Sequence, residues 1–134
     1  VIEKNDPETF NTNSEVPAIE KQRPEIEKIL QGNLVEAAHE VKGKTLVLEV
    51  AGKRVLRFED FETINGPDLH IYLATDKSAK DYIDIGGIKA TKGNVNYELP
   101  DNVDLNKYNH VLVWCVPLKV LFSYSILNAS TTVE

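Results

Sequence analysis

From residue 44 to residue 127 the chain is made of short apolar segments in which every second residue is large and apolar. The clearest are KTLVLEV, DLHIYLA, HVLVWCV and KVLFSYSIL. A period of two places alternate side chains on opposite faces of a β-strand. Turn-forming residues separate the segments, as in Asn65-Gly66-Pro67 and Lys92-Gly93-Asn94. With no long amphipathic helix between them, these segments predict an all-β fold, an antiparallel β-sandwich.

The first 31 residues are predicted to lie outside this domain. Residues 1 to about 23 are polar, charged and interrupted by Pro7 and Pro17, as in a tether. In the next segment, PEIEKIL, Pro24 suits the first turn of a helix and the apolar residues have helical spacing. We therefore expect a tether with a short helix over 1–31, a domain over 32–128 and a tail over 129–134. The leader is either a spacer from a surface anchor or an ordinary chain end.

Charge and cysteine content exclude several classes of protein. The 134 residues carry a net charge of −6, whereas nucleic acids and anionic membranes attract clustered Lys and Arg. One Cys cannot form an internal disulfide. No apolar segment approaches the roughly 20 residues of a membrane span. Because the chain starts at Val1, we expect a trimmed fragment, with any signal or lipid anchor upstream.

Four blocks carry a family resemblance: EAAHEVKGK, RVLRFEDFETINGPDLHIYLAT, DYIDIGGIKATKGNVNYELP and VDLNKYNHVLVWCVPLKVLFSYSIL. In this order they resemble the electron-transfer DM-thirteen domain family, which is distantly similar to DOMON β-sandwich domains. The resemblance runs from about Gly32 to Leu127. It implies an extracytoplasmic β-sandwich with a proposed redox role through a cysteine, whose place Cys115 takes. A His in the first family block matches His39.

Two interpretations of Cys115 are open. A reactive thiol needs a helix N-terminus, a cation or a metal nearby, and HVLVWCVP offers none locally. A small buried hydrophobe is the usual role of a free Cys. On an extended strand Cys115 shares a face with Val111 and Val113, while His110 and Trp114 lie on the other face. His110 and Cys115 are therefore not expected at one metal.

No cofactor is identified, and two are disfavoured. A blue-copper site lacks a Met ligand and a His after Cys115, and c-type haem lacks its C-x-x-C-H motif. A His pair such as His39 and His70 is the remaining haem option. The candidates at a cofactor are His39 and Trp114, although a surface His and a core Trp are the simpler interpretations. Structural zinc lacks suitably spaced ligands.

Two polar segments are candidate binding loops. INGPDL is first a turn, with Gly66 permitting a positive φ, but Asn65 and Asp68 could line a rim site. In KGNVNYELP a turn is expected at Gly93-Asn94. The candidate loop residues are Asn65, Asp68, Asn94 and Asn96.

Two functions follow. The first is an extracytoplasmic redox or electron-transfer accessory domain that acts through Cys115 on an unknown redox or surface partner protein. The second is a non-enzymatic cell-surface binding or adhesion module, with Cys115 packed and a recognition surface over residues 65–68 and 86–96. Independent turnover is not expected, since hydrolase and phosphate-loop motifs are missing from the sequence.

Overall fold

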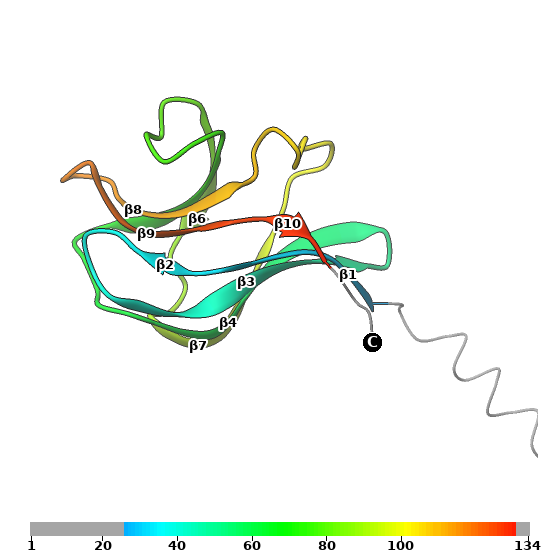
Figure 1. Ribbon diagram of the computed structural model, residues 1–134, viewed down its shortest axis with the longest axis horizontal. Helices are drawn as coiled ribbons and strands as arrows, with labels where there is room; N and C mark the ends of the chain where they lie inside the picture. The colour runs from blue at the N-terminus through cyan, green and yellow to red at the C-terminus, as the bar shows by residue number, and fades with distance from the viewer. Residues whose placement is uncertain (1–25, 131–134) are drawn as a thin grey trace, which may run out of the picture.

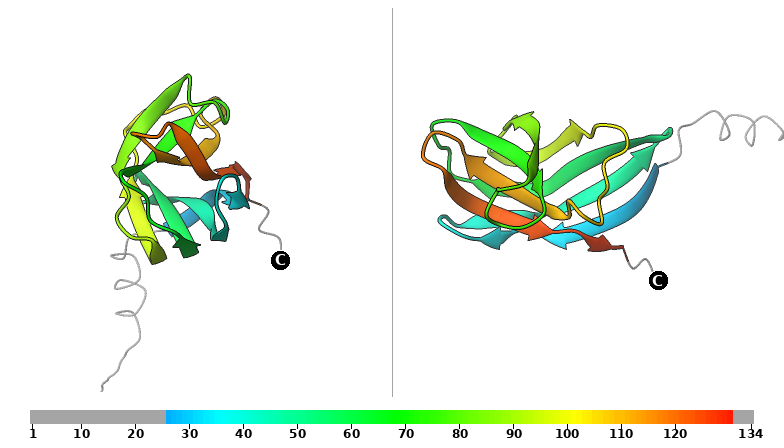
Figure 2. Two further views of the ribbon diagram at one scale, coloured as in Figure 1. Left: turned by 90° about the vertical axis from the view of Figure 1, so that its left-hand side faces the viewer. Right: turned by 90° about the horizontal axis from the view of Figure 1, so that it is seen from above.

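The computed structural model describes residues 26–130. Two five-stranded sheets pack face to face over this range, as two layers in Figures 1 and 2. The strand order is β10-β1-β3-β4-β7 in the first sheet and β2-β9-β8-β5-β6 in the second. All pairings are antiparallel, which confirms the predicted β-sandwich. Residues 26–130 contain no helix.

The strands follow the predicted apolar segments and range from two residues in β2 to eleven in β4. Those of the first sheet are β1 (Ile26–Asn33), β3 (Val41–Val50), β4 (Lys53–Thr63), β7 (Lys92–Glu98) and β10 (Asn128–Ala129). Those of the second sheet are β2 (Val35–Glu36), β5 (Leu69–Ala74), β6 (Tyr82–Gly87), β8 (His110–Cys115) and β9 (Val120–Ile126). Strands β1 and β10 reach beyond residues 32 and 128, which we predicted as the domain limits.

The segment predicted as a short helix is strand from Ile26 onward, so the helix prediction is wrong there. β1 pairs with β3 along its length, with a β-bulge between Lys28 and Leu30. Both Ile29 and Leu30 pack against the core, because a bulge interrupts the alternation of a strand. Two consecutive inward residues imitate helical spacing. Residues 24 and 25 and the predicted tether lie outside the described residues.

One two-stranded ribbon joins the two sheets. Leu30 pairs with Ala129 in the first sheet, and Val35 pairs with Tyr124 in the second, in one unchanged register. β1 therefore pairs with β10 and β2 pairs with β9. Together these four strands form one continuous two-stranded ribbon that crosses from the first sheet to the second. At the crossing, a Cβ on Gly32 would overlap the carbonyl oxygen of Ile126. Glycine is therefore what lets the two backbones approach here.

A two-residue turn joins β3 and β4 into a hairpin. Its two connecting residues, Ala51 and Gly52, have φ angles of 53° and 81°. A two-residue turn with both φ angles positive is the type I′ turn, whose twist matches that of paired strands. The turn sets the register in which Val50 faces Lys53.

The main core lies between the sheets, and a second apolar cluster lies on the outer face of the second sheet. The inward side chains of β5 are all buried: Leu69, Ile71 and Leu73. The outward cluster contains Tyr72, Ala74 and Leu112, with Ala79, Trp114, Val116, Leu121 and Tyr124 packed against them. The second sheet therefore packs apolar side chains on both faces.

Candidate functional site

Cys115 is the last residue of β8 and has 0% exposed surface. Its neighbours across the sheet are Leu69 on β5 and Val120 on β9. It belongs to the main core with Val111 and Val113, which confirms the predicted face. The thiol is free, and the core cluster around it is made of apolar and aromatic side chains. A partner in solution therefore has no direct path to the sulfur.

His39 lies in the bend after β2, at the edge of the second sheet. Its backbone N–H donates to the carbonyl oxygen of Phe122 over 3.2 Å. Its ring meets the Phe122 ring edge-on, with centroids 4.2 Å apart. Since Phe122 belongs to the main core, His39 covers the core at this edge.

The structure does not bring His39 and His70 together. His39 packs on the inward-facing Phe122, whereas His70 lies on the outer face of β5, opposite Trp114 on β8. Strands β9 and β8 separate β2 from β5, a distance of about 14 Å at ~4.8 Å per strand. Two axial ligands must meet one iron from opposite sides, so this pair does not fit a haem.

Three residues that sequence reasoning did not connect form a cluster on the outer face: Asp68, His70 and Asp84. The Nδ1 atom of His70 lies 2.9 Å and 3.0 Å from the two carboxylate oxygens of Asp84. Its Nε2 atom lies 3.3 Å from an oxygen of Asp68. Both ring nitrogens can donate only when the imidazole is protonated. The hydrogen bond to Asp84 is the main cause that raises the pKa of His70 above 6.5.

The side chains of the four polar residues predicted to line binding loops all make polar contacts within the protein. The side-chain oxygen of Asn65 accepts from the Gly66 N–H, and that of Asn94 accepts from the Asp60 N–H, both at 2.9 Å. Arg57 donates to the Asn96 side chain over 3.1 Å. Asp68 faces His70. These side chains hold local structure, and much of the range 86–96 is strand in β6 and β7.

Two glycine predictions are wrong in their detail. Gly66 does not adopt a positive φ; instead, a Cβ there would come within 2.9 Å of the Phe122 ring. Gly93 has a φ of 108° but lies within β7. It pairs with Phe61 next to the shift in the β4–β7 register, so it is a strand residue beside a bulge in β4 and does not form the predicted turn.

Trp114 lies on the outer face of the second sheet, partly buried. It stacks with Tyr72 of β5, with ring centroids 6.0 Å apart. Tyr72 stacks in turn with Tyr82 of β6 at 4.1 Å. Alternation along β5 assigns Tyr72 to this face, but nothing in the sequence identifies β6 as its neighbour. Sequence reasoning therefore missed the two tyrosines.

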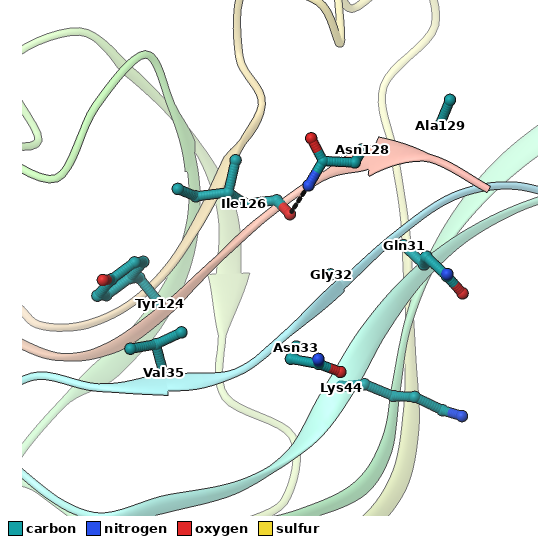
Figure 3. Close-up of a pocket in the computed structure, with 9 residues that line it drawn as sticks. All are labelled: Gln31, Gly32, Asn33, Val35, Lys44, Tyr124, Ile126, Asn128 and Ala129. Atoms are coloured by element: carbon teal, nitrogen blue, oxygen red, sulfur yellow. Dashed lines mark hydrogen bonds between the residues drawn. The ribbon is translucent and has the colours of Figure 1, made fainter. Parts of the chain in front are cut away.

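A cavity of about 660 Å³ is an open groove on the outside of the ribbon that joins the sheets (Figure 3). Amide side chains line one end, and Val35, Tyr124 and Ile126 line the other. Asn128 donates to the carbonyl oxygen of Ile126 over 3.2 Å. The predicted site residues lie elsewhere.

Residues 26–130 bring together no three His, Cys, Asp or Glu side chains that could hold a metal ion. Within that same range, the structure has no helix long and apolar enough to span a membrane.

Comparison with known families matches residues 33–127 to the family described as Electron transfer DM13, the DM-thirteen family of the resemblance above. Neither curated proteins nor solved structures give a match. The matched region includes every strand from β2 to β9, together with Cys115 and the outer-face cluster. The family description suggests a redox-related role. Since the match spans well over half of the chain, the protein belongs to the electron transfer DM13 family.

Proposed function

We propose that this domain is an extracytoplasmic accessory domain of a redox system, and that it contributes by binding a partner rather than through its own thiol. The observation that carries this proposal is the complete burial of Cys115 between the two sheets. Thiol chemistry with a partner requires access to the sulfur and a stabilised thiolate. A surrounding of apolar side chains supplies neither.

The redox context is supported by membership of the electron transfer DM13 family. The extracytoplasmic location is supported by the family resemblance, whose members are commonly exported or on the cell surface. The partner is a redox or surface protein, and the domain has no turnover of its own.

A second candidate is a thiol carrier at Cys115, in line with the cysteine role that the family resemblance implies. Cys115 is the last residue of β8, and the next residue, Val116, donates its N–H to the Asp68 carbonyl oxygen over 2.9 Å. Loss of that strand end would expose the sulfur. With one thiol in the chain, the chemistry would run through a sulfenic acid or a disulfide to another molecule.

The experiment that separates the two is a thiol titration of the 134-residue chain in native buffer and in urea. The control is a Lys53→Cys variant in a Cys115→Ala background, because Lys53 is exposed on the first sheet. We expect the control thiol to react at once and Cys115 to react only as the protein unfolds. Reaction of native Cys115 at a rate near that of the control would overturn the proposal in favour of the thiol carrier.

A further inference from the structure

The outer face of the second sheet carries a cleft of about 240 Å³. Its lining comes from three strands, from the β5–β6 loop over residues 75–81 and from the β8–β9 turn over residues 116–119. Figure 1 shows the loop above β8. The lining residues are Tyr72, Ala79, Tyr82, Trp114, Val116 and Lys119.

Aromatic rings with nearly parallel planes form most of the cleft. The ring of Tyr72 makes an angle of 13° with that of Tyr82 and 24° with that of Trp114. Tyr72 is buried, whereas Tyr82 is 45% exposed. Tyr82 therefore uses one face of its ring against Tyr72 and leaves surface open to a ligand. A flat ring could extend this stack.

The backbone on both sides of the cleft is left-handed at residues other than glycine. Ala79 in the loop has a φ of 59°, and Lys119 in the turn has a φ of 55°. Glycine or asparagine would relieve this conformation. The Lys119 N–H donates to the Val116 carbonyl oxygen over 3.3 Å and closes the turn. The turn therefore holds Lys119 beside the cleft.

The polar groups of the cleft are suited to an anion. Lys119 is the one charged side chain that lines it, and the indole N–H and the ammonium can only donate. Burial, followed by the contact with Tyr82, raises the pKa of Tyr72 to about 12, so its hydroxyl stays protonated. The nearby carboxylates of Asp68 and Asp84 are engaged by His70. A sugar would need acceptor side chains such as carboxylates or amides, and none of these lines the cleft.

We infer that this cleft binds a flat, ring-shaped carboxylate, whose ring stacks on the open face of Tyr82 in the cleft that Trp114 also lines and whose carboxylate pairs with the Lys119 ammonium. The inference rests on the proposed function, in which the domain acts by binding. It gives the chemistry of the group that this cleft would bind. Electron-rich aromatic faces supply the stacking surface, and the ammonium supplies charge and hydrogen bonds.

The test uses the single Trp of the chain, since its indole N–H gives one cross-peak in a nitrogen-15 spectrum. The full chain is titrated with 2-naphthoate, with decahydro-2-naphthoate and with 2-naphthalenemethanol. The second probe keeps the charge without the flat ring, and the third keeps the ring without the charge. We expect saturable shifts of the Trp114 indole with 2-naphthoate and binding about tenfold weaker for each of the other two.

Variants localise the effect. Tyr82→Leu and Lys119→Gln should each weaken 2-naphthoate binding about tenfold. Lys119→Arg keeps the positive charge and should bind 2-naphthoate as the wild type does. Lys53→Gln, on the exposed side of the first sheet, should leave it unchanged. An indole that does not move with 2-naphthoate, equal affinity for decahydro-2-naphthoate, full affinity in Lys119→Gln or a saturable shift with cellobiose would each overturn the inference. Fast native labelling of Cys115 would instead overturn the proposed function, so the two failures are distinguishable.

Discussion

At the scale of single residues, the polar side chains near the turns hold the backbone together. The side chains of Asn65 and Asn94 accept from backbone N–H groups, as short polar side chains commonly do in turns. Asp84 accepts from the Gly86 N–H over 2.8 Å while it faces His70. The Asp68–His70–Asp84 cluster therefore links the loop before β5 to the edge strand β6 and makes this link sensitive to protonation.

Replacement of His70 by Gln should change how stability depends on pH. Because its two carboxylate partners raise the pKa of His70 in the folded state, its contribution is present in full below pH 6.5. The contribution is lost as the pH rises through the raised pKa. Urea midpoints of the wild type and of His70→Gln, measured from about pH 5.5 to about pH 8.5, should therefore converge as the pH rises.

The titration of His110 does not disturb this comparison. Burial lowers its pKa, so its effect on stability has the opposite sign, and it is the same in both proteins. It therefore cancels in the difference between them. A difference between wild type and His70→Gln that stays constant with pH would contradict the role given to the cluster.

At the scale of elements, sequence patterns predict the strands well where alternation is unbroken and fail where a bulge interrupts it. The faces of β5 and β8 follow from alternation alone, including the inward position of Cys115. The bulge at Ile29 imitates a helix, and Gly93, a strand residue beside a bulge in β4, imitates a turn. Both depend on a partner strand distant in sequence, which no local pattern encodes. The stack on Tyr72 was missed for the same reason.

The β3–β4 turn offers a stabilising substitution. Ala51 holds a φ of 53° at the first position of a type I′ turn and is followed by Gly52. Asn tolerates this conformation better than Ala, and Asn-Gly is the favoured pair for the turn. Ala51→Asn should therefore raise the free energy of unfolding by about 0.5–1 kcal/mol, measured by urea denaturation. A loss of stability would mean that the turn adopts another geometry.

At the scale of the whole molecule, the sandwich is closed on one side and its two sheets differ in character. The ribbon of β1, β2, β9 and β10 joins the layers, and beneath it Thr45 and Ser125 share a buried hydrogen bond of 2.7 Å. The first sheet carries exposed cross-strand ion pairs, such as those of Lys42 with Glu62 and Lys53 with Glu98. The second carries the aromatic cluster, so a partner that seeks apolar surface will meet that sheet.

Gly32→Ala tests the closure of the sandwich. The added Cβ would overlap the Ile126 backbone, which cannot move without separating the ribbon. We expect a loss of about 2 kcal/mol or more in the free energy of unfolding. Gly87→Ala is the matched control, because its Cβ would find its nearest atoms 4.0 Å away, and it should cost less than about 0.5 kcal/mol. Equal losses of unfolding free energy in the two variants would show that the close approach of the backbones at Gly32 does not hold this side of the sandwich closed.

The pairing of β1 with β10 has a mechanical consequence. Leu30 faces Ala129, and the Ser130 N–H donates to the Ile29 carbonyl oxygen over 3.2 Å, so the two ends of the described chain lie at the same end of the first sheet (Figure 1). A force that pulls these ends apart acts perpendicular to the β1–β10 pair and loads the hydrogen bonds at its end first. Its hydrogen bonds would break one after another, beginning at Ser130, rather than all together. A domain held by both ends under tension would therefore lose β10 first, while the strands that enclose Cys115 and the aromatic cleft stay paired.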